Sequence, residues 1–311
     1  MERLSTLHDI PEAARGASVA IGNFDGVHLG HQAVIDMARR DDLPLGVMTF
    51  EPHPRSYFAE NRGDKSAFRL MTADAKAHRL EKLGVERLYE VPFDAALAAL
   101  TPEKFVRATL SEGLGARHVV VGADFRFGKD RAGDANALRS LAEPQGIEVT
   151  IADMVATDKA EVSSTNIRRA LGEGRPRDAA AMLGHWHRLE GEVIHGDARG
   201  RDLGYPTANM SLGALHHPSY GVYAVLVDVL DGPHAGSYHG AASIGVRPMF
   251  GENAANCETF LFDFTGDLYG ATISVGLVDY LRGEQKFNGL DALITQMGAD
   301  CETARAILAA L

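Results

Sequence analysis

The sequence predicts a two-domain α/β protein, in which a doubly wound parallel sheet is followed by a small antiparallel β-barrel with terminal helices. Its 311 residues suit two cores better than one. Up to about Leu183, short β-branched runs alternate with longer amphipathic segments, as in a parallel sheet flanked by helices. After Leu183, clusters of Gly, Asp and Pro separate the expected strands, which is typical of antiparallel pairing.

The N-terminal half is expected to form a Rossmann-like sheet. Its strands are predicted at Ser18–Gly22, Leu45–Thr49, Arg87–Val91, His118–Gly122 and Ile147–Ile151, with helices from about Gly30 to Arg40 and from about Asp74 to Gly84. A third helix has Thr101 as its N-cap and Pro102 at its first position. The near-continuous apolar run at His118–Gly122 indicates a strand that is buried on both faces.

The C-terminal half is expected to form the barrel. Its strands are predicted at Leu189–Ile194, Gly221–Val229, Tyr238–Ile244, Glu258–Phe264 and Thr272–Tyr280, with closing helices at about Leu290–Met297 and Cys301–Ala310. Because the rhythm changes near Leu183–His185, we predict one domain over residues 1–183 and a second over residues 184–311.

Composition excludes several classes of protein. Acidic residues outnumber basic ones by 42 to 31, which argues against a nucleic-acid-coating role but leaves a local cationic pocket possible. The charged N-terminus does not resemble a signal peptide, and no apolar run approaches the roughly 18 residues of a membrane span. Two cysteines are too few for a disulfide framework. We therefore expect a cytoplasmic protein with no membrane or nucleic-acid partner, while its oligomeric state stays open.

A candidate anion site follows the first predicted strand. Gly22, Asn23, Phe24 and Asp25 lead into His28-Leu-Gly-His31, which opens a helix. Helix N-termini present unpaired N–H groups to anions, and ligands bind beyond the carboxyl ends of parallel strands. The sequence matches the HxGH signature of nucleotidyltransferases, so His28 and His31 form a candidate polyphosphate cradle. The alternative is a pair of surface histidines at a helix start.

Three further segments carry candidate ligand residues. Ser163-Ser164-Thr165-Asn166-Ile167-Arg168 offers hydroxyls and a cation for triphosphate oxygens, or is an ordinary N-cap. Gly122–Gly128, with Asp124, could hold a base or flat ring, or is a glycine-rich connection. In the barrel half, glycines and oxygen donors that suit phosphates and Mg²⁺ cluster at Gly196, Arg199, Gly200, Gly204, Thr207 and Asn209. A plain turn followed by a strand explains that cluster equally well.

The strings IGNFDGVHLGHQ, TFEPHPR, GADFRFGKDRAGD, SSTNIR and PTAN together resemble the bacterial bifunctional riboflavin kinase/FAD synthetase family. The resemblance implies ATP-dependent phosphorylation of riboflavin to FMN and adenylylation of FMN to FAD, with Mg²⁺. It implies that His28, His31, Asp124, Ser164, Thr165 and Arg168 bind ATP, and that His53, Pro54, Arg55 and Arg247 lie near flavin. It also implies that Thr207 and Asn209 hold Mg²⁺ and phosphates, and that Glu258 is the catalytic base of the kinase.

Some residues depart from the family pattern. Glu161 replaces a residue that is often basic in relatives, and Ser243 and Met249 replace the usual Asn and Thr. Leu183-Gly-His-Trp-His187 also replaces a more usual Arg-Pro-Tyr after Leu-Gly. These departures keep open a second hypothesis, an adenylyltransferase with a degenerate kinase barrel. A third hypothesis, a flavin-binding sensor without chemistry, is disfavoured because His28, His31, Thr207, Asn209 and Glu258 are all present.

Overall fold

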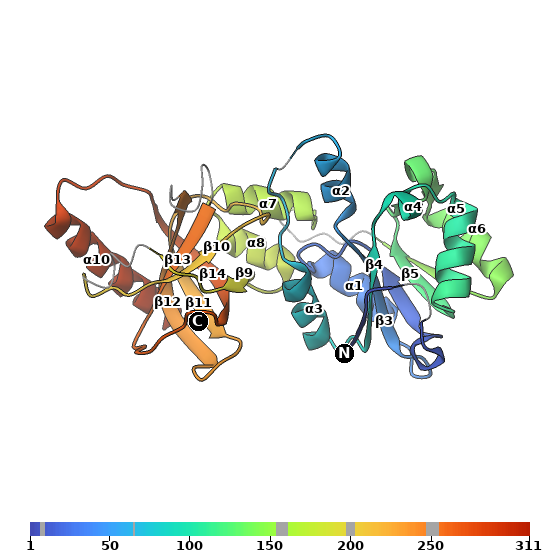
Figure 1. Ribbon diagram of the computed structural model, residues 1–311, viewed down its shortest axis with the longest axis horizontal. Coiled ribbons are helices and arrows are strands. Elements are labelled where there is room, and N and C mark those ends of the chain that lie inside the picture. Colours follow the sequence, from blue (N-terminus) through green and yellow to red (C-terminus); the bar gives the residue numbers. More distant parts are fainter. Residues whose placement is uncertain (7–9, 65, 154–160, 197–202, 247–254) are drawn as a thin grey trace. The chain divides into compact units, whose positions relative to one another are not determined.

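The computed structural model describes residues 1–6, 10–64, 66–153, 161–196, 203–246 and 255–311. The chain forms two compact units (Figure 1). The first contains Met1–Ser66 and Ala73–Val162, and the second contains Ala67–Thr72 and Ser163–Leu311.

The first unit is built on a six-stranded parallel sheet. Its strands are β1 (Glu2–Leu4), β2 (Ser18–Ile21), β3 (Leu45–Glu51), β4 (Arg87–Pro92), β5 (His118–Gly122) and β8 (Glu148–Ala152), in the order β1-β4-β3-β2-β5-β8. All neighbouring strands run parallel. From β2 the chain adds β3 and β4 on one side and then β5 and β8 on the other. The strand order therefore reverses beside β2, and ligands bind at such switch points.

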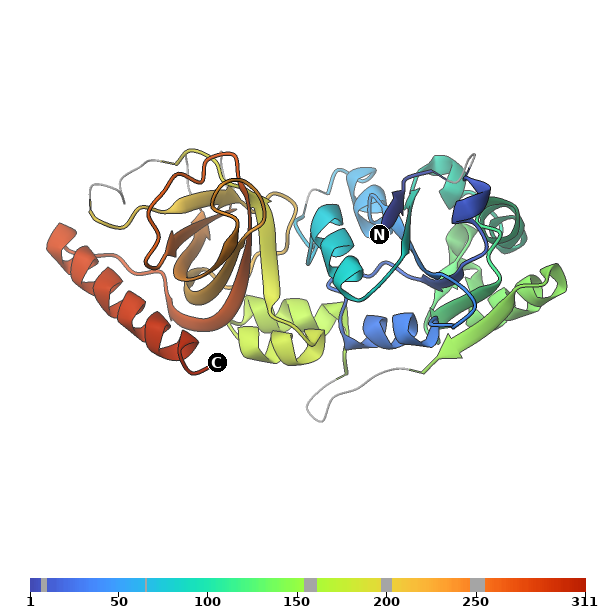
Figure 2. The same ribbon diagram turned by 90° about the horizontal axis from the view of Figure 1, so that it is seen from below.

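Helices cover both faces of this sheet (Figure 2). The helices of the unit are α1 (Leu29–Met37), α2 (Pro54–Glu60), α3 (Ala73–Lys82), α4 (Ala95–Ala98), α5 (Pro102–Lys104), the π-helix η2 (Phe105–Gly113) and α6 (Ala135–Ala142), with short 3₁₀ turns η1 (Glu12–Ala14), η3 (Lys129–Arg131) and η4 (Glu143–Gln145). Crossover connections between parallel strands are right-handed. Because β2-α1-β3 and β5-α6-β8 proceed in opposite directions along the sheet, their helices lie on opposite faces of it. The predicted cap is confirmed: the Thr101 side chain accepts a hydrogen bond from Lys104 N.

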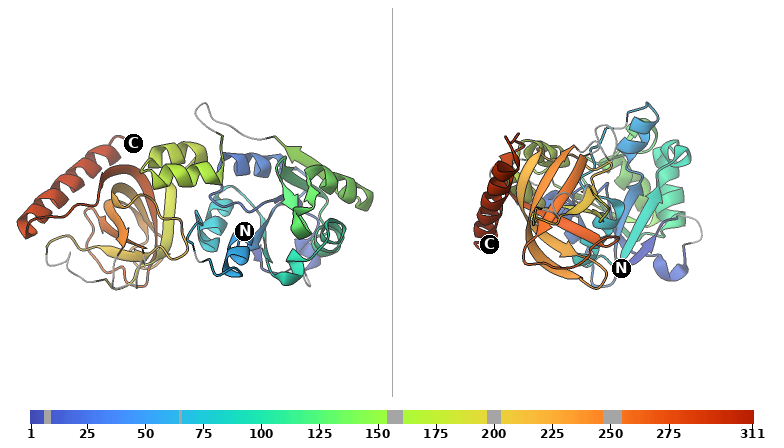
Figure 3. Two further views of the ribbon diagram at one scale, coloured as in Figure 1. Left: turned by 90° about the horizontal axis from the view of Figure 1, so that it is seen from above. Right: turned by 60° about the vertical axis from the view of Figure 1, so that its left-hand side comes forward.

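The second unit is an antiparallel barrel with helices around it (Figure 3). Its strands are β9 (His187–Glu192), β10 (Ala208–Ser211), β11 (Gly221–Val229), β12 (Gly236–Val246), β13 (Ala255–Leu261) and β14 (Thr272–Gly283), in the order β10-β13-β12-β11-β14-β9. Ile194 N donates to Asn209 O at 2.8 Å, which links the chain after β9 back to β10 and nearly closes the barrel. Val225, Ile244, Cys257 and Val275 are fully buried inside it. The predicted barrel is confirmed.

The expected pair of closing helices is wrong, because the chain ends in one continuous helix, α10 (Leu290–Leu308). The break was expected near Gly298, but a helical glycine costs only about 1 kcal/mol. Asp300, next to that site, accepts hydrogen bonds from Arg282 at 2.7 Å and from Gln296 at 2.9 Å. Ala304 and Leu308 then pack on Ala224. Docking on the barrel thus outweighs the local helix-breaking signal.

Two more helices, α7 (Ser164–Gly172) and α8 (Pro176–Leu183), pack with the barrel rather than with the parallel sheet. The boundary between the two compact units therefore lies between Val162 and Ser163. The predicted boundary at residue 183 divides the chain by activity instead, and it stays a prediction. Within the described ranges, none of the helices combines the length and the apolar character that crossing a bilayer requires.

Candidate active sites

The turn from β2 into α1 has an unusual backbone. Phe24, Gly26 and Val27 have φ values of 50°, 91° and 44°, a region that residues with a Cβ atom rarely adopt. Burial holds this conformation, since Phe24 and Val27 are at most 1% exposed. Backbone strain of this kind is found at functional sites, where the surrounding fold fixes it. The turn lies at the carboxyl end of the central strand, where a ligand site was predicted.

His28 and His31 are brought together at the start of α1. His28 is the N-cap, and its Nδ1 accepts a hydrogen bond from His31 N at 3.3 Å. The two imidazole rings stack, with centroids 3.6 Å apart and planes 14° from parallel. A side chain at Gly30 would come within 3.2 Å of the His28 ring, so glycine leaves room for the pair. The result is two imidazoles beside the positive end of a helix.

The His31 ring is poised to receive a ligand atom. Its Nδ1 is buried and has no hydrogen-bond partner in the part of the chain that the structure describes. Burial lowers the pKa of His31 well below its usual range, and electrostatic repulsion from the neighbouring His28 and Lys76 lowers it further. His31 is therefore neutral near pH 7. Because buried polar atoms are nearly always paired, an unpaired ring nitrogen here indicates a site for an external partner.

Lys76 is a buried cation that the sequence analysis did not identify. Its side chain, on α3, is 1% exposed, and Nζ donates to Thr49 Oγ1 at 2.9 Å and to Glu51 Oε1 at 2.8 Å. Thr49 Oγ1 in turn donates to Asn23 O at 3.1 Å. A chain of hydrogen bonds thus joins α3 and β3 to the β2–α1 turn. The sequence does hold a signal for this buried lysine, because Lys76 lies between Ala75 and Ala77 on the apolar face of its helix.

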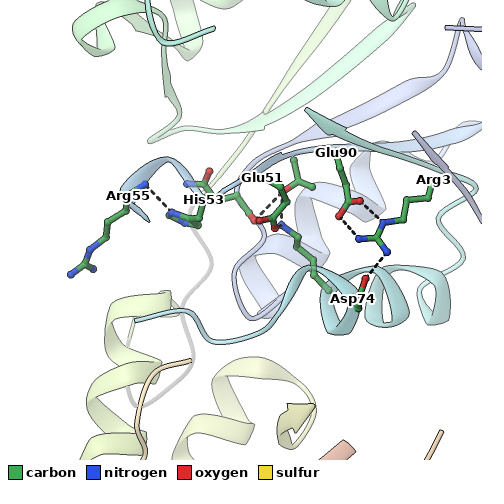
Figure 4. Close-up of polar contacts among 9 residues, drawn as sticks. Arg3, Glu51, His53, Arg55, Asp74 and Glu90 are labelled. Atoms are coloured by element: carbon green, nitrogen blue, oxygen red, sulfur yellow. Dashed lines mark hydrogen bonds and ion pairs between the residues drawn. The ribbon is translucent and has the colours of Figure 1, made fainter. Parts of the chain in front are cut away.

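The segment after β3 forms a second helix start (Figure 4). His53 is the N-cap of α2 and is 9% exposed, and its Nδ1 accepts a hydrogen bond from Arg55 N at 3.0 Å. Pro54 occupies the first helical position, and the Arg55 side chain is exposed and extends away from His53. His53 therefore shapes the Pro-flanked turn, and its role near flavin stays a prediction.

Figure 4 also shows a separate ion-pair cluster on β1, β4 and α3. Arg3 pairs with Glu90 and donates to Asp74 Oδ1 at 2.6 Å. It connects the edge strand β1 to its neighbours, so its role is structural.

The loop after β5 is only partly available to a ligand. Asp124 is exposed, and a Cβ atom at Gly122 would lie 3.0 Å from its carboxylate, so glycine makes room for that side chain. Phe127 lies on β6 (Arg126–Phe127), which pairs with β7 (Gly133–Asp134). It is 6% exposed and packs against Phe105 in the core. The Phe127 ring is therefore a core element, and Phe125 is the half-buried aromatic of this loop.

The hydroxyl-rich segment begins α7 in the second unit. Ser163 is the N-cap and accepts a hydrogen bond from Asn166 N at 3.2 Å, so its hydroxyl serves the helix. Ser164 is half-buried and Thr165 is exposed at the same helix end. Arg168 Nε donates to Phe68 O at 2.6 Å, and its guanidinium lies over the Phe68 ring, 5.2 Å from the centroid. Arg168 thereby holds the segment Ala67–Thr72 to this unit.

A polar strip crosses three strands of the barrel. Glu258 on β13 is directly opposite Asn209 on β10 and opposite Ser243 on β12. Directly opposed residues of antiparallel strands present their side chains on the same face. Their neighbours Ala208, Cys257 and Ile244 belong to the barrel core, so the polar strip is on the face turned away from it. The register therefore brings together Asn209 and Glu258, which the sequence placed in one site.

The Asn209 side chain is tightly enclosed. It is 7% exposed, and its Nδ2 donates to Thr207 O at 3.2 Å. A Cβ atom at Gly196 would lie 2.5 Å from Nδ2, so Gly196 lets the backbone approach this amide. Gly204 has a φ of 82°, which favours glycine. The predicted nucleotide residues Arg199 and Gly200 and the predicted flavin residue Arg247 lie outside the described residues, as does Met249.

Thr207, Asn209 and Glu258 fit a hard divalent cation by their donor chemistry, since hydroxyl, amide and carboxylate oxygens are ligands that Mg²⁺ accepts. Nowhere in the described ranges do three or more His, Cys, Asp or Glu residues gather as a metal site would require. A cation here would therefore depend on neutral protein oxygens, Glu258 and the phosphates of a nucleotide. Glu284, whose carboxylate lies against Gly245 on the same face of β12, is a further acidic group that the sequence analysis did not single out.

Comparison with known proteins supports the same two units. The bifunctional riboflavin kinase/FMN adenylyltransferase of Pseudomonas fluorescens is 40% identical, covering 99% of this chain and 98% of the relative. That of Listeria monocytogenes is 39% identical, covering 94% of this chain and 93% of the relative. A crystal structure titled as a macrolide-efflux protein from Streptococcus pneumoniae has a TM-score of 0.82 and 34% identity, covering 97% of this chain and 98% of that one.

The fold and the two sites define a transferase in which an α/β unit with a His-x-Gly-His turn is joined to a six-stranded barrel. Residues 10–166 match the family model described as FAD synthetase, and residues 183–308 match the one described as riboflavin kinase. The chain belongs to the bifunctional riboflavin kinase/FMN adenylyltransferase family.

Proposed function

We propose that residues 1–183 transfer an adenylyl group from ATP to FMN, and that residues 184–311 transfer the γ-phosphoryl group of ATP to riboflavin. The observation that carries the proposal is the stacked, buried His28–His31 pair at the start of α1, with the unpaired Nδ1 of His31. The two family matches, at residues 10–166 and 183–308, support the division of labour.

In the adenylyltransferase site, an oxygen of the FMN phosphate attacks the α-phosphorus of ATP. The bond from that phosphorus to its bridging oxygen breaks, and pyrophosphate leaves. Negative charge spreads over the phosphoryl oxygens, and His28, His31 and the N–H groups of α1 donate hydrogen bonds to them. Because His31 is neutral before ATP binds, it holds one ring proton for donation and pays no cost to bury a charge.

Other residues of this site are assigned through the family. Gly22, Asn23, Phe24 and Asp25 form the turn that shapes the phosphate site, and Lys76 fixes that turn through Thr49. Asp124, Ser164, Thr165 and Arg168 bind the nucleotide. His53, Pro54 and Arg55 border the flavin.

In the kinase site, the primary hydroxyl of riboflavin attacks the γ-phosphorus of ATP, and ADP leaves. The Glu258 carboxylate takes the hydroxyl proton as the new P–O bond forms. Thr207 and Asn209 hold Mg²⁺, which neutralises charge on the phosphates when bound. Through the family, Gly196, Arg199, Gly200 and Gly204 are assigned to the nucleotide and Arg247 to the flavin. The half-buried position of Glu258, beside Asn209 in the sheet, supports its role as base.

Supplying each flavin separately to the purified protein, with ATP and Mg²⁺, tests the proposal. We expect FMN and then FAD from riboflavin, and FAD from FMN. His31→Ala should abolish FAD formation from FMN and spare FMN formation, because His31 lies in the first unit and the kinase residues Asn209 and Glu258 lie in the second. Glu258→Gln should do the reverse.

The outcomes discriminate between the hypotheses. FAD from FMN without any FMN from riboflavin would mean that the barrel is a degenerate kinase, as Ser243 beside Glu258 would then suggest. Flavin binding without either product would mean a sensor. Loss of both activities in folded His31→Ala would contradict the assignment of two independent sites.

A further inference from the structure

Asn256 is a buried amide next to Asn209. Its side chain, on β13, is 1% exposed, and Nδ2 donates to Asn209 Oδ1 at 3.0 Å. Its own Oδ1 is buried and accepts no hydrogen bond from any residue that the structure describes. Because unpaired buried acceptors are rare and costly, this oxygen calls for a donor that the chain itself does not supply.

The contacts of Asn209 show what Asn256 does to it. Asn209 Nδ2 donates to Thr207 O, and Asn209 Oδ1 accepts from Asn256, so the amide plane is fixed from both sides. Gly196 lies against the same amide, and a Cβ atom at that position would clash with it. An amide oxygen has two lone pairs, and the bond from Asn256 occupies one of them. The other can serve a cation.

The groups around Asn256 explain why its Oδ1 has no protein donor. Glu258 lies two residues further along β13 and therefore on the same face. Gly245 is directly opposite Asn256, and the Glu284 carboxylate lies against Gly245. Both carboxylates offer acceptors, and the hydroxyl of Ser211, which is opposite Asn256 on β10, does not donate to Asn256 Oδ1, so this oxygen still needs an O–H or N–H group. Mg²⁺ keeps several of its waters when it binds to proteins, and such waters are donors that acidic surroundings attract.

We propose that Asn256 is a positioning residue of the kinase site: its N–H group holds the Asn209 amide in place, and its Oδ1 accepts a hydrogen bond from a water of the bound cation. This inference rests on the proposed function, because it takes Asn209 as a ligand of that cation. It adds a residue that affects the affinity for the cation without touching riboflavin or the transferred phosphoryl group.

Titrating Mg²⁺ in the FMN-forming reaction of full-length Asn256→Ala tests the proposal. Losing one hydrogen bond to the ligand and one to its water should raise the Mg²⁺ concentration for half-maximal FMN formation about 10-fold. The rate at saturating Mg²⁺ should change less than about 2-fold, because no reacting group is removed. Cys257→Ala, at the adjacent buried position that faces the barrel core, is the matched control and should leave the Mg²⁺ requirement unchanged.

Thermal unfolding followed by circular dichroism reports whether the barrel of each variant is folded, and FAD formation from FMN reports whether the other activity is intact. If Asn256→Ala unfolds the barrel, Asn256→Ser replaces it, because serine keeps a polar group at this buried position. A Mg²⁺ requirement equal to that of the wild type, or a fall in the saturated rate alone, would overturn the proposal.

A binding measurement separates this inference from the proposed activity. The Mg²⁺-dependent binding of ADP is measured by calorimetry for Asn256→Ala, Asn209→Ala and the double variant. Because the Asn256–Asn209 hydrogen bond can be lost only once, the double variant should bind less weakly than the sum of the two single losses predicts, whereas independent structural effects would add in full. Additivity would refute the inference even if the wild type makes FMN. A wild type that makes no FMN would refute the activity, and the binding cycle would still test Asn256.

Discussion

Replacing Lys76 by Met removes a buried ammonium from α3 and keeps most of the apolar stem. Lys76 Nζ donates to Thr49 Oγ1 and to Glu51 Oε1, and the two charged side chains are 1% and 21% exposed. The substitution leaves the Glu51 carboxylate without this cation and the Thr49 hydroxyl without this donor. Both effects should weaken the contact between β3, α3 and the β2–α1 turn.

The expected magnitude follows from burial. Removing one partner of a fully buried ion pair costs about 3–5 kcal/mol. Because Glu51 keeps some contact with water, we expect the first unit to lose about 2–3 kcal/mol in its free energy of unfolding. Thr49 also donates to Asn23 O, so a looser turn should slow FAD formation from FMN by about 10-fold, which corresponds to roughly 1.4 kcal/mol.

Urea denaturation followed by circular dichroism measures the stability, and hydrogen exchange assigns the loss to α3 and β3. Lys82→Met, an exposed lysine on the same helix, is the matched control and should change stability by less than about 0.5 kcal/mol. The reasoning is refuted if Lys76→Met is no less stable than Lys82→Met, or if FMN formation from riboflavin falls as much as FAD formation.

Two further predictions concern the second unit. Burial lowers the pKa of His187 to about 3 from its usual value of 6.5, so its neutral form stabilises the fold fully above pH 6.5 and this contribution is lost as the pH falls towards 3. Between pH 6.5 and 5 the free energy of unfolding of the wild type should therefore fall by about 2 kcal/mol more than that of His187→Leu. Urea denaturation followed by the fluorescence of Trp186, the single tryptophan, measures both values. Equal losses in the two proteins would contradict this prediction. Asp300→Ala leaves Arg282 without its buried carboxylate and should lower the free energy of unfolding by about 3 kcal/mol. The exposed control Glu302→Ala should lower it by less than about 0.5 kcal/mol. Similar stabilities of these two variants would show that the ion pair does not anchor α10.

Most strands of both units could be predicted because their physical signals are local, but the short β10 (Ala208–Ser211) was missed and β13 was placed three residues too late. His118–Gly122 and Gly221–Val229 were predicted with the bounds that the structure shows, since each is an apolar run with turn residues beyond its ends. The edge strand Glu2–Leu4 was not predicted, because it is short and mostly exposed and has no apolar pattern. The C-terminal helix was divided in error because the pairing of Asp300 with Arg282, 18 residues earlier, has no local signal.

Prediction of the candidate sites is limited in the same way, to residues whose signals are local in the sequence. The HxGH turn could be located from sequence because strand, turn and helix are contiguous. Lys76 and Asn256 could not, since their importance depends on partners 27 and 47 residues away in the chain. A lysine on an apolar helix face is a usable signal, but an asparagine beside a strand glutamate is not distinctive. Sequence alone cannot tell which buried polar atoms lack a partner, and that property identifies both His31 and Asn256.

The most direct test of the account is a crystal structure of the protein with a non-hydrolysable ATP analogue bound in the first unit. Phosphate oxygens should lie within about 3 Å of the His31 ring and of the first N–H groups of α1. A triphosphate bound elsewhere in that unit, with the His28–His31 turn in contact with solvent alone, would contradict it.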